Sequence, residues 1–272
     1  MKLTERKRAL NCAVKAARAV GHLLRQHQHS VKKIDSEIQH DIKLELDVRS
    51  QKLIERTLRK TFPEIAVLGE EGVLGDTNSA ARWVVDPIDG TVNFTYGIPH
   101  ACISIALQIR KPEGSVKSTH PDAAYDTVVG VVYDPFCDEL WTAIRGQPAY
   151  LNGRVIHVSK RAKLEAAILG MGFSKSEHTL NQMLPVFNSM VHRCRKIRLM
   201  GAAALAMTYT ASGRFDMYTE YGLRLWDIAA GGLILECAGG EYWHEPIAGD
   251  HTYHLKADNG LLRKKVDRYS GS

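Results

Sequence analysis

Cysteine is scarce in this sequence, and its few copies are widely spaced. The chain has five cysteines in 272 residues, none of them in a Cys-x-x-Cys pair: Cys12, Cys102, Cys137, Cys194 and Cys237. An odd number of distant cysteines excludes a zinc-ligand pattern and a disulfide framework as the basis of the fold. We expect ordinary free thiols in a reducing cytoplasm, with no part in the chemistry.

Long apolar runs are also missing. The longest ones, such as residues 166–173, fall short of the roughly 20 residues that a membrane-spanning helix needs. Residues 1–5 lack the charged-then-apolar order of a secretory signal. We therefore expect a cytoplasmic protein that does not enter a membrane. With 44% hydrophobic and 24% charged residues, a chain of this length can bury a globular core without disulfides or a structural metal.

The net charge of +6 is concentrated near the N-terminus. Residues 1–33 contain nine Lys or Arg and one acid, Glu5, so this segment carries +8 and the rest of the chain −2. Apolar or small residues recur here at helical spacing, at Leu10, Val14, Ala17, Gly21 and Leu24. The pattern favours a first helix with a solvated basic face, on which His22, His27 and His29 are surface residues. A transit peptide, a membrane-surface helix and an RNA-binding helix are the alternatives.

Helix and strand patterns follow this first segment. A helix is predicted over 47–60, and it ends before Pro63 because proline disfavours helix in the residue before it. Apolar or β-branched runs predict strands over 65–68, 82–85, 101–109, 127–133 and 139–144. The polar stretch 111–126 is interpreted as a long hairpin connection that projects from the surface.

The second half alternates strands with helices. Strands are predicted over 166–170, 196–199 and 215–219, and helices over 180–192, 202–211 and 226–237, the last ended by Gly239-Gly240. No solenoid repeat and no low-complexity linker is present. These patterns indicate one α/β unit of stacked helix and sheet layers over 1–272, with two possible halves, 1–150 and 151–272.

The segment 83–94 concentrates the chemistry. An apolar strand delivers Asp86 and Asp89 to a forced turn, and Gly90-Thr91 then has the form of a helix N-terminus whose N–H groups can receive an anion. Carboxylates and a phosphate are compatible only when cations lie between them. Mg²⁺ takes oxygen ligands from a few carboxylates plus substrate phosphate, so the segment predicts bound Mg²⁺. A plain turn in which an aspartate caps a helix is the alternative.

Two further acidic positions accompany this segment. The pair Glu70-Glu71 follows a predicted strand, and Asp227 stands at the start of an otherwise apolar helix. Each has a plain structural explanation, because the pair can form a solvated turn and Asp227 can cap its helix. Their combination with Asp86 and Asp89 is more informative than any of them alone.

The three acidic motifs resemble, in order and spacing, those of the inositol monophosphatase family of metal-dependent, lithium-sensitive phosphatases. They are Glu70-Glu71, Asp86-Pro-Ile-Asp89-Gly-Thr91-Val-Asn-Phe and Trp226-Asp-Ile-Ala-Ala-Gly. The resemblance also covers residues 41–47, 151–154, 201–203 and 211–216. It implies the layered αβαβα sandwich of inositol monophosphatases and fructose-1,6-bisphosphatases. It also implies a homodimer that hydrolyses myo-inositol monophosphate or a similar polyol phosphate with Mg²⁺.

The resemblance assigns roles to individual residues. It implies two to three bound Mg²⁺ ions. The first would be held by Glu70, Asp86 and the Ile88 carbonyl, and the second by Asp86, Asp89 and Asp227. The catalytic residues implied are Glu70, Thr91 and Asp89, of which Glu70 and the Thr91 hydroxyl orient the attacking water. The substrate contacts implied are Asp89, Gly90, Thr91, Gly201, Ala203, Glu220 and Asp227. Such a site needs no protein nucleophile, because positioning and charge neutralisation do most of the work of phosphoryl transfer.

Rival substrates and one other class of function stay open. Fructose 1,6-bisphosphate, 3′-phosphoadenosine 5′-phosphate and histidinol phosphate are alternatives within the same superfamily. A protein that binds RNA or a ribonucleoprotein through residues 1–33, with a secondary phosphatase activity, is the alternative of another class. The stretch Lys43-Leu-Glu-Leu, larger and more charged than is common in the family, bears on the third metal and on lithium sensitivity.

Overall fold

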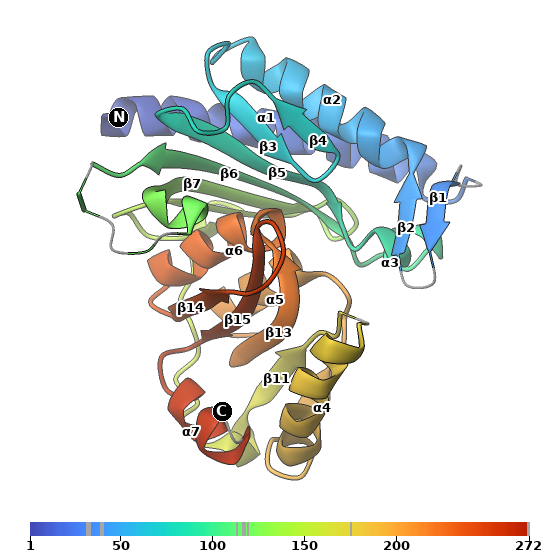
Figure 1. Cartoon of the computed structure of the whole chain (residues 1–272), viewed down its shortest axis with the longest axis vertical. Helices are drawn as coiled ribbons and strands as arrows, with labels where there is room; N and C mark the ends of the chain where they lie inside the picture. Colours follow the sequence, from blue (N-terminus) through green and yellow to red (C-terminus); the bar gives the residue numbers. More distant parts are fainter. Residues whose placement is uncertain are drawn as a thin grey trace.

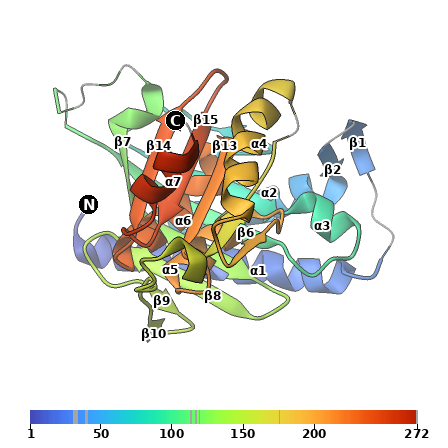
Figure 2. The same cartoon turned by 90° about the horizontal axis from the view of Figure 1, so that it is seen from below.

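The computed structural model describes residues 1–30, 34–38, 41–112, 114–115, 118, 120–174 and 176–270. Its elements are stacked in layers: two helices, a large sheet, two further helices, a smaller sheet and an outer pair of helices (Figure 1). Seen from below, the outer pair covers the smaller sheet (Figure 2). The predicted αβαβα sandwich is confirmed.

The first layer consists of α1 (Leu3–His27) and α2 (Glu45–Arg59). The small and apolar residues of α1 are buried against strands of the large sheet, as their spacing predicts. Gly21 is required there, because a Cβ at this position would lie 2.4 Å from the ring of Tyr133. A hairpin of β1 (Ile34–Ile38) and β2 (Asp41–Leu44), which the patterns did not predict, connects the two helices.

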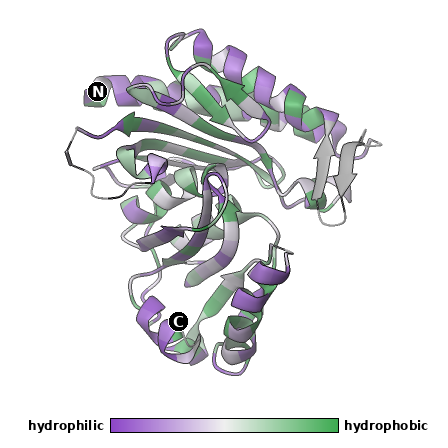
Figure 3. Cartoon of the chain, in the orientation of Figure 1, coloured by the Kyte–Doolittle hydropathy of each residue, from purple (hydrophilic) through white to green (hydrophobic). Residues whose placement is uncertain are grey.

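The larger sheet places the site. Its eight strands run in the order β10 (Arg154–Val155), β9 (Tyr150–Leu151), β8 (Glu139–Ile144), β7 (Tyr125–Asp134), β6 (Cys102–Arg110), β5 (Ala81–Asp89), β3 (Ala66–Gly69) and β4 (Gly72–Leu74). The central strands β5 to β7 are buried on both faces and strongly hydrophobic (Figure 3). Among the described strands of this sheet, only β3 and β5 pair in parallel, so their carboxyl ends meet at one edge.

The smaller sheet has the strand order β12 (Lys196–Arg198), β11 (Ile168–Met171), β13 (Met217–Arg224), β15 (Thr252–Asp258) and β14 (Glu241–Pro246). Between the sheets lie α5 (Ala203–Ala211) and α6 (Leu225–Cys237), which are apolar on nearly every side because both faces are buried. The outer helices are α4 (Glu177–Val191) and α7 (Arg263–Ser270). The core between the sheets includes residues on both sides of position 150.

The predicted helices and strands are confirmed with shifted ends, and several short elements are additional. The patterns missed β1, β2, β4, β9, β10, β14, β15 and α7, and two single turns, η1 (Pro121–Ala124) and η2 (Leu164–Ala166), whereas α3 (Thr91–Thr95) begins where a helix N-terminus was predicted. The strand β14 is polar and largely exposed at a sheet edge, so it lacks the apolar alternation of a strand pattern. Gly239 ends α6 with φ +89°, the left-handed conformation that was predicted.

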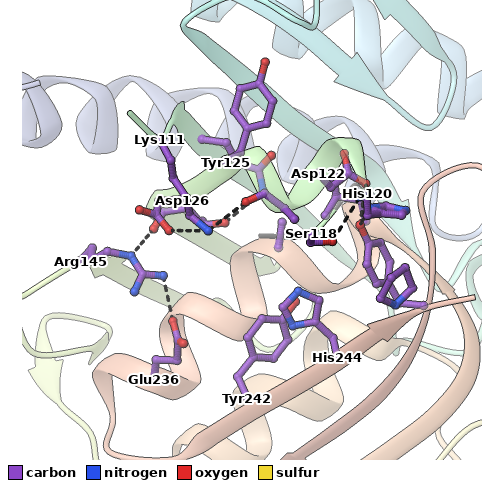
Figure 4. Close-up of a pocket in the computed structure, with 17 residues that line it drawn as sticks. Lys111, Ser118, His120, Asp122, Tyr125, Asp126, Arg145, Glu236, Tyr242 and His244 are labelled. Carbon is purple, nitrogen blue, oxygen red and sulfur yellow. Dashed lines mark hydrogen bonds and ion pairs between the residues drawn. The ribbon is translucent and has the colours of Figure 1, made fainter. Parts of the chain in front are cut away.

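The connection 111–126 does not simply project from the surface, as predicted. Its η1 turn packs inward, because Asp122 is buried and pairs with Arg82 of β5 at 2.6 Å. Beside this turn lies a cavity of about 400 Å³, with Lys111 and Asp126 on one side and Tyr242 and His244 on the other (Figure 4). None of the described residues that line this cavity belongs to the predicted site.

The described residues bear on the predicted lack of a membrane-spanning helix and on the predicted free thiols. In that part of the chain, no helix has the length and apolar content to cross a membrane. All five cysteines are free thiols, as predicted.

Candidate active site

Glu70 and Asp86 meet at the shared edge of β3 and β5. Gly69 pairs with Val85 in the parallel ladder, and the Glu70 amide donates to the Val85 carbonyl at 3.1 Å, which extends the pairing by one residue. The pairing of β5 with β6 is irregular between Asp86 and Asp89. The Ile88 amide closes this irregular turn by donating to Asp86 Oδ1 at 2.9 Å.

Asp227 comes to the same place from the other side of the sheet. It is the third residue of α6, and its Oδ2 accepts the Arg224 amide at 2.7 Å, the cap that the sequence allowed. The Ser104 hydroxyl of β6 donates to the Trp226 carbonyl at 3.0 Å and ties the helix start to the sheet. The Asp86 carboxyl lies near the carboxyls of both Glu70 and Asp227 and affects the pKa of each.

These carboxyls raise one another's pKa. The pKa of Glu70 is raised mainly by burial of its carboxyl and next by the charge of Asp227, although the residue as a whole is exposed. The pKa of Asp86 is raised mainly by burial and next by the charge of Glu70. Burial and then Asp89 raise the pKa of Asp227. Among the described residues, no lysine, arginine or histidine forms an ion pair with these four carboxyls. Carboxylates packed in this way need protons or cations between them.

Asp89 has a second task that sequence reasoning missed. Its carboxylate accepts the amides of Ala203 at 3.1 Å and Ala204 at 2.7 Å, and the Cys102 thiol contacts it at 3.5 Å. Burial raises the pKa of Asp89, and these amide hydrogen bonds oppose the rise. Asp89 therefore caps the N-terminus of α5 across the chain, and Cys102 belongs to the surroundings of the site. No local sequence signal shows a cap supplied from 114 positions away.

The donor set suits Mg²⁺. In the described part of the chain, no three His, Cys, Asp or Glu side chains are arranged to hold one ion by themselves. The predicted trio Asp86, Asp89 and Asp227 is therefore not a ready-made cage, because Asp89 faces α5. Mg²⁺ does not require such a cage, since it keeps several waters and commonly binds one or two carboxylates plus substrate oxygens. The neighbouring carboxyls of Glu70, Asp86 and Asp227 meet that demand.

The predicted anion cradle lies directly after Asp89. Gly90 has φ +95°, and α3 begins at Thr91. The Thr91 hydroxyl donates to the Ile88 carbonyl at 2.8 Å, so this hydroxyl and this carbonyl are neighbours, as the predicted roles require. Asn93 donates to the Met200 carbonyl at 2.7 Å and holds the predicted Gly201 loop beside α3.

We expect Gly90→Ala to destabilise the protein by about 2 kcal/mol, because it combines a left-handed backbone with a steric clash. A Cβ at Gly90 would lie 2.9 Å from the His100 carbonyl oxygen. Gly97 is the matched control, since its φ is +74° but a Cβ there would meet no atom within 4 Å. Urea denaturation should show a smaller loss for Gly97→Ala, and equal losses would contradict the clash.

Glu220 of β13 joins the same group. The Tyr218 hydroxyl donates to Glu220 Oε2. The pKa of Glu220 is raised to about 7, because burial and the nearby Asp89 raise it by more than the Tyr218 hydrogen bond lowers it. Gly172 leaves room for this carboxyl, because a Cβ there would overlap it at 1.8 Å. Sequence reasoning found Glu220 through the resemblance but missed the Tyr218 and Gly172 that position it.

One acidic residue near the site had no predicted role of its own. The charge of Asp47, which is buried in the first turn of α2, raises the pKa of Glu70. The resemblance included residues 41–47 only as a matching stretch. The structure thus brings together the side chains of Glu70, Asp86, Asp89 and Asp227, with Glu220 and Asp47 at the border of this group.

The comparison with known proteins agrees with this arrangement. A sequence profile described as the inositol monophosphatase family matches residues 5–256. The chain belongs to this family. Among the relatives of this inositol monophosphatase family member is the protein named Nus factor SuhB of Pasteurella multocida, which is 35% identical over 265 residues, 94% of this chain and 93% of the relative.

Two further matches cover most of this family member. Inositol monophosphatase 1 of Solanum lycopersicum is 35% identical over 238 residues, 85% of this chain and 82% of that protein. The crystal structure of extragenic suppressor protein suhB from Bartonella henselae has a TM-score of 0.84 at 31% identity, covering 96% of this chain and 98% of that one. The predicted family and fold are confirmed.

Proposed function

We propose that this protein is a Mg²⁺-dependent phosphomonoesterase that hydrolyses myo-inositol monophosphate or a similar polyol phosphate. The observation that supports it most is the position of the Asp86 carboxyl near both Glu70 and Asp227, with no described lysine or arginine paired to any of them. Such a cluster is costly to a fold that has no cation to place there. Family membership supports the same class of activity.

The proposed metal ligands divide between two principal ions. Glu70, Asp86 and the Ile88 carbonyl would hold one, and Asp86 and Asp227, with Asp89 as the third predicted ligand, would hold the other; a weaker third ion would lie near Glu70. Bound Mg²⁺ supplies positive charge that lowers the pKa of water and stabilises the attacking and leaving oxygens. Asp89 already accepts two α5 amides, so its carboxylate is fixed in direction.

The protein groups then position the water and the phosphate. Glu70 accepts a proton of the attacking water, and the Thr91 hydroxyl, whose proton is donated to the Ile88 carbonyl, accepts another hydrogen bond from that water. The amides of Gly90 and Thr91 would donate to phosphate oxygens. Holding water and phosphorus in line in this way supplies much of the rate enhancement.

The polyol would bind between α5 and β13. Glu220 is directed by the Tyr218 hydroxyl and can accept hydrogen bonds from ring hydroxyls, and Gly201 and Ala203 are the further substrate contacts that the family resemblance implies. A polar site of this kind discriminates against substrates that lack the matching hydroxyl, because its own groups would be left unpaired. The name of the Solanum lycopersicum relative, inositol monophosphatase 1, supports a polyol substrate.

The experiment that tests this proposal is phosphate release from a panel of monoesters. Purified protein stripped with EDTA should be inactive, and added Mg²⁺ should restore release from inositol 1-phosphate in preference to fructose 1,6-bisphosphate, 3′-phosphoadenosine 5′-phosphate and histidinol phosphate. Activity on one rival alone would reassign the substrate. Failure on all four with Mg²⁺ would refute the class. The predicted homodimer and its cytoplasmic location stay predictions, the first measurable by light scattering.

A further inference from the structure

The outer surface of α2 carries a row of cations that the fold does not use. Arg49, Lys52, Arg56 and Arg59 follow one another at helical spacings of three and four residues, and all are exposed. Their apolar neighbours Ile54 and Leu58 point the other way, into the core. Like charges at these spacings repel one another and destabilise a helix. The row therefore costs stability in the absence of an anionic partner.

Three shallow hollows join this row to α1. The first hollow lies between α2 and β4. Lys52 and Arg56 line both this hollow and a second one, and Lys60 lines both the first hollow and a third that reaches α1. Their volumes are about 490, 350 and 310 Å³. Seven exposed cations line the three hollows: Arg8, Lys15, Arg49, Lys52, Arg56, Arg59 and Lys60. We call this surface the basic face.

The basic face has almost no compensating negative charge. Glu55 is the single carboxylate among the described lining residues, and it accepts a hydrogen bond from Gln51 at 2.9 Å. Within the described part of the chain, none of the seven cations forms an ion pair. The face also lies on the outermost helix layer, on the far side of the large sheet from α5 and α6 (Figure 1).

We infer that the basic face binds the phosphate backbone of a double-stranded nucleic acid without reading its sequence. From Arg49 to Arg59 the cations extend about 15 Å along the helix at 1.5 Å per residue, and a duplex offers a continuous array of phosphates to such a row. The cations of α2 dominate, so the surface differs from the segment 1–33 that the sequence suggested for RNA binding.

The lining excludes the other anionic partners. Among the described residues that form it there is no aromatic residue and no methionine, the residues that anchor protein interfaces and that stack on unpaired bases. An anionic membrane surface would need an exposed apolar helix face beside the cations, whereas the apolar face of α2 is buried. Phosphates of a stacked duplex are the remaining match in charge and shape.

Fluorescence anisotropy with a labelled 20-base-pair RNA or DNA duplex of arbitrary sequence, in EDTA, tests the inference. EDTA removes Mg²⁺, so that metal-dependent binding of phosphate at the proposed phosphatase site does not contribute to the measured affinity. The test variant is Lys52→Gln/Arg56→Gln/Arg59→Gln. The control variant, Arg195→Gln/Lys264→Gln/Arg268→Gln, removes the same charge from exposed residues of the opposite layer, which also lack ion pairs.

We expect the native protein to bind both duplexes at 50 mM salt with an affinity that falls steeply as salt rises. The test variant should weaken binding at least about tenfold and reduce the slope of log K against log salt by about 2 to 3, since each lost phosphate contact removes about 0.9. The control variant should retain most of the affinity and the slope. Equal weakening by both variants would overturn the inference.

Two further results would also overturn it. One is the absence of duplex binding by the native protein at 50 mM salt. The other is binding of poly-glutamate in place of the duplex, which would assign the face to an acidic protein. Phosphate release by the test variant, measured separately with Mg²⁺, should equal that of the native protein, so the inference and the phosphatase proposal fail independently.

Discussion

Asp86→Asn is expected to lower phosphate release by about 10³-fold or more while leaving the free energy of unfolding of the metal-free protein unchanged or higher. Asp86 lies near two other carboxyls, those of Glu70 and Asp227; burial raises the pKa of Asp86, and their charges raise it further. An asparagine can keep the hydrogen bond from the Ile88 amide with its oxygen and donate its own amide protons toward the two carboxylates. The substitution therefore relieves repulsion at nearly constant volume and removes a proposed metal ligand.

Asp89→Asn is the informative companion to this variant. It should also abolish most activity, but we expect it to destabilise the protein by about 1–2 kcal/mol, the cost of a lost helix cap. The Asp89 carboxylate accepts the amides of Ala203 and Ala204, and an asparagine NH₂ would face one of those donors. Urea denaturation in EDTA and phosphate release with Mg²⁺ measure the two effects separately.

Two outcomes would contradict this account. If Asp86→Asn kept more than about a tenth of the native activity, the carboxylate cluster would not be the metal centre. If it destabilised the metal-free protein by several kcal/mol, Asp86 would be a structural residue, comparable with the buried aspartates elsewhere in the fold. Melting curves should also show that Mg²⁺ stabilises the native protein more than Asp86→Asn, because ligand binding adds its free energy to folding.

Asp122→Ala is expected to destabilise the protein by about 3–5 kcal/mol, the usual cost of breaking a buried ion pair. Arg82 and Asp122 are both buried, 2.6 Å apart. Asp122 Oδ2 also accepts the Tyr253 hydroxyl at 2.6 Å and lies 2.7 Å from His251 Nδ1. Alanine would leave the guanidinium charge in the core without a partner. Chemical denaturation of the metal-free protein measures the loss.

Asp126→Ala is the matched control in the same connection. Asp126 lies 3.5 Å from Lys111 and is half exposed, at 52%, so its loss should cost less than about 1 kcal/mol. A double replacement of Arg82 and Asp122 by Met and Leu should recover much of the stability, because it removes both charges together. Equal effects of Asp122→Ala and Asp126→Ala would show that the buried network does not stabilise the fold.

The same network predicts how stability responds to acid. Burial alone would raise the pKa of Asp122, but hydrogen bonds from His251, Tyr253 and Arg82 hold it well below its ordinary value. A carboxyl whose pKa is lower in the folded state stabilises the protein above its unfolded pKa of about 4, and that contribution is lost as the pH falls below it. Asp122→Ala should therefore reduce the loss of stability on acidification.

The helix and sheet patterns were readable where one face of an element is buried. The stripe of α1 and the apolar runs of β5, β6 and β7 follow directly from burial against a neighbouring layer. The edge strand β14 was missed because its side chains are largely exposed. The inward turn of the 111–126 connection was missed because a single aspartate in a polar stretch does not indicate that it pairs with Arg82, 40 positions earlier.

The sequence by itself determined which chemical groups are available: hard carboxylates at Glu70, Asp86, Asp89 and Asp227, placed at the ends of apolar segments. Only the tertiary structure decided which of these carboxylates lie together and which groups each of them faces. It brought Asp86 against both Glu70 and Asp227 and turned Asp89 toward α5. The reason is physical: side-chain types are local, whereas like charges across 157 positions are held together only by the packing of two sheets around α5 and α6.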